Sequence, residues 1–159
     1  MRTAQFHTTQ GEMVFELFEE DAPLSVRHFI KLTEKGFYNG LVFFQYVQEG
    51  FLKSGCPNND GSGFSGYLIK SEVSGRRQEH DRGVLSLVCG RKNTVGSQFI
   101  VCLDRDMVQG FDRHHTCIGK MQNRGWETLF KLRRFDQILS VEIGEIDDSS
   151  EVDEDELYD

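Results

Sequence analysis

The sequence has little proline, a single tryptophan and no long hydrophobic run. Its 159 residues include only 2 prolines, against 16 glycines and 13 phenylalanines. This balance favours many short strands with glycine turns and aromatic packing over a bundle of helices. At this length we expect one domain with a substantial core.

The four cysteines, Cys56, Cys89, Cys102 and Cys117, include no C-x-x-C pair, which argues against a zinc site. Three of them lie in apolar runs, where a free thiol behaves as a small hydrophobic side chain. The start of the chain lacks a basic stretch followed by an apolar one, and no run approaches membrane-spanning length. We therefore expect a protein of a reducing compartment, cytoplasmic or nuclear, without membrane attachment or bound metal.

The acidic residues are concentrated at one end of the chain. Residues 145–159 hold 9 acids and no base, whereas residues 1–144 hold 18 bases and 17 acids. A segment this acidic does not fold alone. We predict a domain over 1–144 and an acidic tail over 145–159. The tail is interpreted either as a solubilising end or as a docking segment for a basic partner, with Leu157 and Tyr158 as anchors.

Alternating apolar and polar residues predict short strands throughout the domain. Two helices are expected, one opened by Asp21-Ala22-Pro23 and ended by Gly36, the other over residues 125–135. Residues 55–67 and 104–114 are predicted to be long polar loops. The expected strands cover residues 2–8, 12–18, 42–47, a run from 50, 83–89, 97–103, 115–120 and 138–143.

The middle of the chain carries a long signature. Residues 93–99 read N-T-V-G-S-Q-F, which resembles the N-T-N-G-S-Q-F signature of the cyclophilin-type peptidyl-prolyl isomerases. Leu85-Ser86-Leu87 is similar to the preceding L-S-M strand of that family, and residues 115–120 are similar to its H-x-x-F-G-K strand. The resemblance covers residues 2–144. It implies an all-β fold with two helices, a closed eight-stranded antiparallel cyclophilin-like barrel capped by helices.

The resemblance also implies a reaction. Rotation about the bond that precedes proline is slow because the C–N bond has partial double-bond character, with a barrier of ~20 kcal/mol. Catalysis needs an apolar pocket for the proline ring, donors for the neighbouring carbonyls and a donor toward the proline nitrogen. No cofactor, metal or proton transfer is required. The expected partners are proline-containing or extended peptide segments.

The family's key donor is an arginine in F-H-R-x-x-P-G-F-x-x-Q-G-G, and this chain lacks it. Ungapped comparison with residues 44–56 places Tyr46 at the arginine and Ser54 at the glutamine. Tyrosine offers one neutral donor in place of a charged fork of five. Losing a charged donor to the transition state costs about 10²-fold or more in rate. The catalytic residue stays unassigned, and weak or absent isomerase activity is expected.

The rest of the family's peptide site is partly preserved. Gln98 and His115 match the family, and Phe51 and Leu52 match the floor of its pocket. The family's tryptophan has no counterpart, because its place is taken by Gly110, followed by a phenylalanine. By resemblance, the peptide-binding residues are Phe51, Leu52, Ser54, Val88, Cys89, Gln98, Ile100, Phe111 and His115.

Three functions stay open at the level of sequence. The first is a divergent cyclophilin that binds peptide and isomerises it weakly or not at all. The second is a working isomerase in which Tyr46 or another residue supplies the donor. The third is a structural subunit, for example of a spliceosomal assembly, that uses the barrel surface and the acidic tail.

The candidate residues and the charged surface also have purely structural interpretations. Phe51 and Ile100 could be plain barrel core, and His115 could be a structural histidine. The basic pairs Arg76-Arg77 and Arg133-Arg134 are too few and too separated to argue for direct nucleic-acid binding. A monomer is expected when the protein is free.

Overall fold

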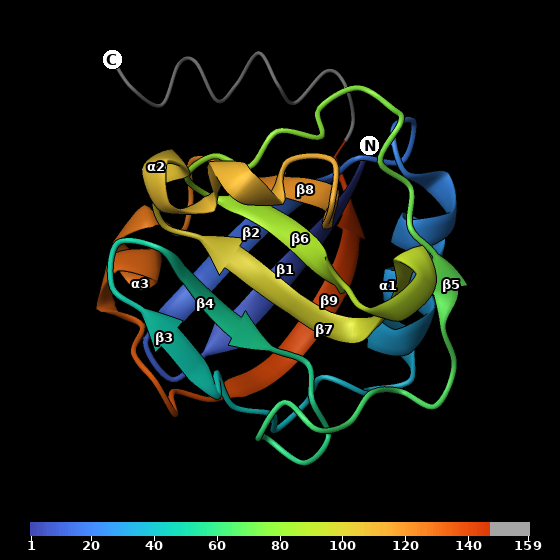
Figure 1. The fold of residues 1–159 in the computed structure, drawn as a ribbon. Helices are drawn as coiled ribbons and strands as arrows, with labels where there is room; N and C mark the ends of the chain where they lie inside the picture. Colours follow the sequence, from blue (N-terminus) through green and yellow to red (C-terminus); the bar gives the residue numbers. More distant parts are fainter. Residues whose placement is uncertain (147–159) are drawn as a thin grey trace.

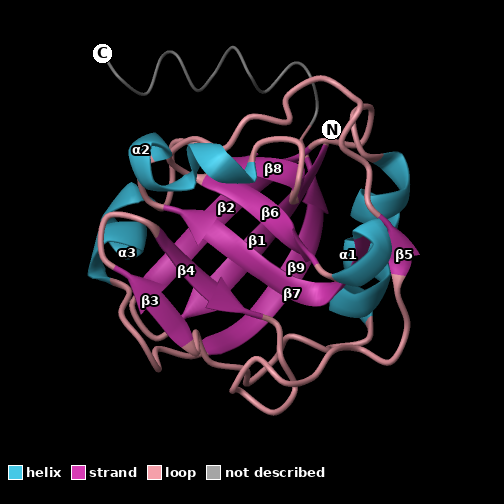
Figure 2. Ribbon diagram, in the orientation of Figure 1, coloured by secondary structure: helices cyan, strands magenta, loops and turns pink. Residues whose placement is uncertain are grey.

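The computed structural model describes residues 1–146, and residues 147–159, most of the predicted acidic tail, lie outside the described part (Figure 1). All strands join one antiparallel sheet in the order β3-β4-β7-β6-β8-β2-β1-β9, with β5 paired to β7. Figure 2 shows that this sheet curls around on itself. The strands are β1 (Arg2–Thr8), β2 (Gly11–Leu17), β3 (Gln45–Val47), β4 (Phe51–Ser54), β5 (Ile69–Lys70), β6 (Val84–Cys89), β7 (Thr94–Cys102), β8 (Thr116–Met121) and β9 (Ile138–Glu145).

The two end strands, β3 and β9, are not neighbours in this order, and a short bridge lies between them. Val42 and Gln137 form an isolated antiparallel bridge. Beside it, the Phe43 N–H donates to the Asp136 carbonyl at 2.9 Å, and the Ile138 N–H donates to the Leu41 carbonyl at 2.8 Å. The prediction was a closed eight-stranded antiparallel cyclophilin-like barrel capped by helices. The cyclophilin-like antiparallel fold is confirmed as a curled sheet, and this bridge links the segments that precede its two end strands.

Both predicted helices are present as α1 (Pro23–Glu34) and α3 (Trp126–Lys131), which lie on opposite sides of the sheet in Figure 1. A third helix, α2 (Arg105–Val108), lies in the segment predicted as a polar loop. The Asp104 side chain caps α2 by accepting from the Asp106 N–H, which is the cap expected for an aspartate at this position. Local capping therefore gives structure to a segment that has no hydrophobic periodicity.

The main core fills the inside of the curled sheet. Phe6, Phe29 and Phe99 are fully buried there, and the Phe6 and Phe99 rings meet edge to face at 5.6 Å between centroids. Tyr38 joins them, with its hydroxyl donating to the Ser97 carbonyl at 3.0 Å. Aromatic pairs of this kind add about 0.5–1.5 kcal/mol each beyond the area they bury.

A second, smaller hydrophobic cluster lies on the other face of the sheet, because alternate residues of a strand point to opposite sides. We call it the outer cluster. Its buried members are Phe18, Val84, Ile100, Cys102, Val108 and Cys117, and the half-buried Phe51, Val88 and Phe111 pack against it. The segment with α2 covers part of this cluster, since Val108 and Phe111 belong to that segment.

All four cysteines are free and buried. Within residues 1–146, no helix is both long and apolar enough to cross a membrane, and no three potential ligands gather in a metal-binding arrangement.

Candidate functional site

Five of the nine predicted peptide-binding residues meet at the outer cluster. The Phe51 and Phe111 rings lie 5.8 Å apart, and the Phe111 and His115 rings lie 4.6 Å apart. Ile100 forms the buried floor, and Val88 packs against the same cluster. The result is an apolar floor with two half-buried aromatic rings and an imidazole at its border. Such a surface can hold a proline ring or another apolar side chain.

His115 is held in a neutral form. Its Nδ1 accepts from the Cys89 N–H at 2.9 Å, so in the neutral ring the proton is on Nε2. Burial, with smaller contributions from the neighbouring His114, His80 and Lys53, lowers the pKa of His115 to about 4. At neutral pH the residue is therefore a neutral hydrogen-bond donor beside the apolar floor and carries no positive charge.

A groove of about 490 Å³ continues from the outer cluster along β7. Val88 and Gln98 line it, and its rim carries Arg91 and Lys92 but no acidic residue. Gln98 does not point freely into this groove, because its Nε2 donates to the carbonyls of Gly61 and Gly63 at 3.0 and 2.8 Å. Gln98 thus fixes the glycine-rich loop that forms one wall.

Three residues of the predicted peptide site direct their side chains away from the outer cluster. Leu52 is 0% exposed and pairs with Val101 in the main core. Ser54 is also 0% exposed, and its hydroxyl donates inward to the Val42 carbonyl at 2.8 Å. The Cys89 side chain belongs to the main core, and only its backbone N–H reaches the site. Strand alternation turns these side chains away from the outer face.

Tyr46 does not stand at the outer cluster either. In β3 it pairs with Leu52, packs against the main core, and lies under the Arg133 guanidinium, 5.2 Å from the ring centroid. Counting residues along the chain placed Tyr46 at the family's arginine, but counting does not determine which face of the sheet a side chain occupies. In β3 the Tyr46 side chain lies on the same face as Leu52, opposite to the face of Phe51 and Ile100.

Lys53 is the charged residue that the sequence analysis missed. It lies two residues after Phe51 on β4 and pairs with Ile100, so it shares the outer face with both. Burial lowers the pKa of Lys53, and its charge contributes to the low pKa of His115. The alternation of β4, read from Phe51, is a sequence signal that could have identified it.

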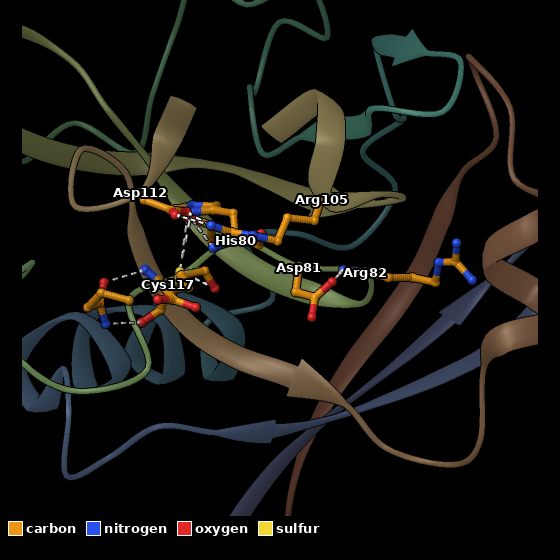
Figure 3. A network of polar contacts seen from close by, with 9 residues as sticks. His80, Asp81, Arg82, Arg105, Asp112 and Cys117 are labelled. Carbon is orange, nitrogen blue, oxygen red and sulfur yellow. Dashed lines mark hydrogen bonds and ion pairs between the residues drawn. The ribbon is translucent and has the colours of Figure 1, made fainter. Parts of the chain in front are cut away.

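A buried polar network ties the covering segment to the sheet (Figure 3). His80 Nδ1 lies 3.2 Å from Asp112 Oδ1, and His80 Nε2 lies 2.7 Å from the Ser86 hydroxyl. Arg105 completes the network, donating to the Asp112 carboxylate at 2.8 Å and to the His80 carbonyl at 2.7 Å. Figure 3 shows these groups gathered beside Cys117.

The order Ser86, His80, Asp112 has the hydrogen-bond pattern of a hydrolase triad, but its burial excludes that chemistry. Ser86 and His80 are both 0% exposed, so no substrate reaches the hydroxyl. Burial lowers the pKa of His80 against the opposing effect of Asp112, and a neutral ring donates to the carboxylate while accepting from the serine. The network therefore positions the segment that carries Phe111 and His115. His80 and Asp112 are 32 residues apart in sequence, and no motif linked them.

Comparison with known proteins agrees with this architecture. The family model described as "Cyclophilin type peptidyl-prolyl cis-trans isomerase/CLD" matches residues 3–151. Among solved structures, a cyclophilin-type peptidyl-prolyl cis-trans isomerase of Cryptosporidium parvum, crystallised in the presence of the dipeptide Ala-Pro, is similar with a TM-score of 0.80 and 22% identity. The likeness covers 91% of this chain and 99% of that one, and it shows the shared fold.

Curated relatives are closer in sequence. A peptidyl-prolyl cis-trans isomerase of Helicobacter pylori is 37% identical over 87% of this chain and 84% of its own length. One of Synechococcus elongatus is 35% identical over 90% of this chain and 97% of its own length. The peptidyl-prolyl isomerase CWC27 of Cryptococcus neoformans is 35% identical over 72% of this chain but only 24% of its own length. The chain belongs to the cyclophilin-type peptidyl-prolyl cis-trans isomerase family.

Proposed function

We propose that the outer face of β4, β6 and β7 binds proline-containing or extended peptide segments and isomerises X-Pro bonds weakly or not at all. The observation that carries this proposal is the grouping of Phe51, Ile100, Phe111 and His115 on one face. A proline ring fits an apolar floor of this kind, and the neutral Nε2–H of His115 is available to a peptide carbonyl. The adjacent groove extends the surface for a longer segment.

The expected weak catalysis depends on which hydrogen-bond donors face the bound peptide. Twisting the X-Pro bond moves the amide nitrogen toward a pyramidal, proton-accepting state, and a charged donor aimed at this state stabilises it. Tyr46 lies on the inner face and cannot reach a peptide bound over Ile100. The neutral His115 supplies a hydrogen bond without a charge. With His115 as the donor, binding stabilises the ground state and the transition state about equally, which leaves the rate almost unchanged.

Peptide binding is tested by titrating the ¹⁵N-labelled protein with a short peptide that contains Ala-Pro. We expect the amide resonances of Phe51, Ile100 and Phe111 to move. Phe111→Ala should weaken binding by about tenfold, the order expected for a buried aromatic contact. Leu139→Ala is the matched control, because Leu139 is 53% exposed on β9 at the other edge of the sheet. Equal effects of the two substitutions, or shifts away from these residues, would overturn the proposal.

A working isomerase is the second candidate, and Lys53 is the observation that favours it. Lys53 is a cation on the same face as Phe51 and Ile100, where the family's arginine would be needed. If it serves as the donor, Lys53→Met abolishes catalysed exchange of a proline peptide, whereas Lys53→Arg retains it. Peptide affinity, measured in parallel, separates loss of catalysis from loss of binding. Equal exchange in Lys53→Met and the unmodified protein would exclude Lys53 as the donor.

A further inference from the structure

The solvent side of α1 forms a basic groove. Arg27, Lys31 and Lys35 project from it at helical spacing and are exposed. Together with Arg2 of β1 they line a groove of about 400 Å³. Ile30 provides an apolar wall, and Glu34 is the only acid among the lining residues. We call this surface the α1 groove.

Three of the four cations of the α1 groove lack ion-pair partners in the described part of the chain. Among residues 1–146, Arg27, Lys31 and Lys35 make no ion pair, and Arg2 pairs with Glu19 at 3.6 Å. Three like charges along one helix face repel one another unless an anion lies between them. The groove therefore favours an acidic occupant.

The chain enters its acidic segment at the edge of this groove. Arg2 pairs with Glu145 across β1 and β9, and the Ile146 N–H donates to the Met1 carbonyl at 2.8 Å. Residue 147 thus follows Ile146, which lies beside Met1, one residue beyond the pairing of Arg2 with Glu145. The next 13 residues, 147–159, hold 8 acids and no base.

We propose that residues 147–159 bind in the α1 groove, as an intramolecular cover over the basic face of α1. A 13-residue segment extends to about 43 Å, whereas α1 with its 12 residues is about 18 Å long. The segment therefore reaches every cation of the groove. Near the end of the segment, Leu157 and Tyr158 can contact the apolar side of α1, where Leu24 is 55% exposed.

The charges on the other surface near Met1 also favour binding of the acidic segment in the α1 groove. Glu19, Glu20 and Asp21 lie next to Met1, so an acidic segment that turned that way would meet carboxylates. Arg76 and Arg77 share that surface, but Arg77 is already paired with Asp21 and Glu16. The α1 groove offers Arg27, Lys31 and Lys35, which make no ion pair in the described residues, against 1 lining carboxylate, while Arg2 is shared with Glu19. Because the segment is tethered beside it, a high effective concentration adds to many individually weak contacts.

The test keeps the full chain and changes only charge. In one variant the acids of 153–156 become amides: Asp153→Asn, Glu154→Gln, Asp155→Asn and Glu156→Gln. In ¹⁵N spectra we expect the amide resonances of Arg27, Lys31 and Lys35 to move in this variant, while those of α3 stay in place. Raising NaCl from about 0.1 to about 1 M should move the same resonances in the unmodified chain, because the Debye length falls from about 10 to about 3 Å. The salt effect should be lost in the amide variant.

Charge reversal on the groove side gives the complementary result. Lys31→Glu should abolish the salt-dependent shifts, whereas Lys131→Glu on α3, an exposed lysine on the opposite side of the sheet, should leave them intact.

Unmoved α1 resonances in the amide variant would overturn the proposal. Shifts at Arg91 and Lys92 would assign the segment to the groove beside β7 instead. Shifts that weaken on dilution would assign a second copy's segment to α1. Peptide titration at Phe51 and Phe111 is a separate readout, so this inference and the proposed function fail independently.

Discussion

Tyr46 and Lys53 lie on neighbouring strands but face opposite sides of the sheet. The register pairs Tyr46 with Leu52 and pairs Gln45 with Lys53, and successive side chains of a strand alternate. Tyr46 therefore belongs to the core, while Lys53 belongs to the outer face with Phe51. For single residues, the face of the sheet limits chemistry more strongly than the position in a motif.

Tyr46→Arg should fail to create an isomerase. The new guanidinium would replace a ring that packs on the main core and would lie beside Arg133, so it would be partly desolvated and repelled. We expect the free energy of unfolding to fall by about 1–3 kcal/mol. Catalysed exchange of a proline peptide should not increase. Denaturant unfolding and exchange spectroscopy measure the two effects, with Tyr46→Phe as the control that keeps the ring. A large gain in exchange would mean that residue 46 reaches the outer face.

Because of His115, the free energy of unfolding should decrease as the pH falls. Its folded pKa of about 4 lies below its ordinary 6.5, so the unfolded chain takes up a proton first. The stabilising contribution of the neutral ring is complete above pH 6.5 and is lost progressively between 6.5 and 4. At about pH 5 the loss should be about 2 kcal/mol. Protonation also removes the acceptor of the Cys89 N–H.

Unfolding free energies measured from pH 7 to pH 5 check this contribution. His115→Gln should reduce the pH dependence by about 2 kcal/mol at the acid end. His114→Gln, at the exposed neighbour, should reduce it by much less, because His114 lowers the pKa of His115 less than burial does. A His115→Gln variant with the full pH dependence of the unmodified chain would contradict the assignment.

At the scale of elements, the segment that runs from α2 to His115 is held by Asp112. Burial works to raise the pKa of Asp112, but hydrogen bonds from Arg105 and His80 outweigh it and hold the pKa below its usual range. The ionised carboxylate thus joins α2 to the segment before β6. Phe111 and His115 flank this anchor in the sequence, which makes their positions depend on it.

Asp112→Asn should loosen the segment without unfolding the sheet. Loss of the charged pair with Arg105 should lower the free energy of unfolding by about 2 kcal/mol. Peptide affinity should fall as well, because Phe111 and His115 lose their support. Asp106→Asn, an exposed change on α2, is the control. Calorimetric unfolding and peptide titration measure both effects, and an unchanged peptide affinity would show that the anchor does not position the site.

The elements themselves were largely predictable from local patterns. The first hairpin, the helix opened by Pro23 and the central strands follow from alternation, turn residues and capping, which act within a few residues. The helix α2 was not predicted, because four residues carry no periodicity and only the Asp104 cap marks them. The register of β4 also escaped prediction, and with it the directions of Leu52 and Ser54, because pairing with β7 sets it.

At the scale of the whole molecule, one curled sheet separates two hydrophobic clusters. Its inner face holds the main core, and its outer face holds a smaller cluster that a covering segment leaves partly open. The family and the floor residues could be predicted from the signature over 93–99 and the neighbouring strands. The anchoring of His80 by Asp112 could not, because these residues are 32 apart in sequence and meet only in the folded chain.

Exchange spectroscopy on a proline-containing peptide, with a substoichiometric amount of the full chain, tests the central claim most directly. The Helicobacter pylori peptidyl-prolyl cis-trans isomerase, 37% identical over 87% of this chain, provides the side-by-side comparison. We expect peptide resonances that shift or broaden on binding, with catalysed cis–trans exchange at least about 10²-fold slower than that of the relative. Exchange as fast as that of the relative would contradict the account and would assign the missing donor to another residue of the outer face, with Lys53 the first to replace.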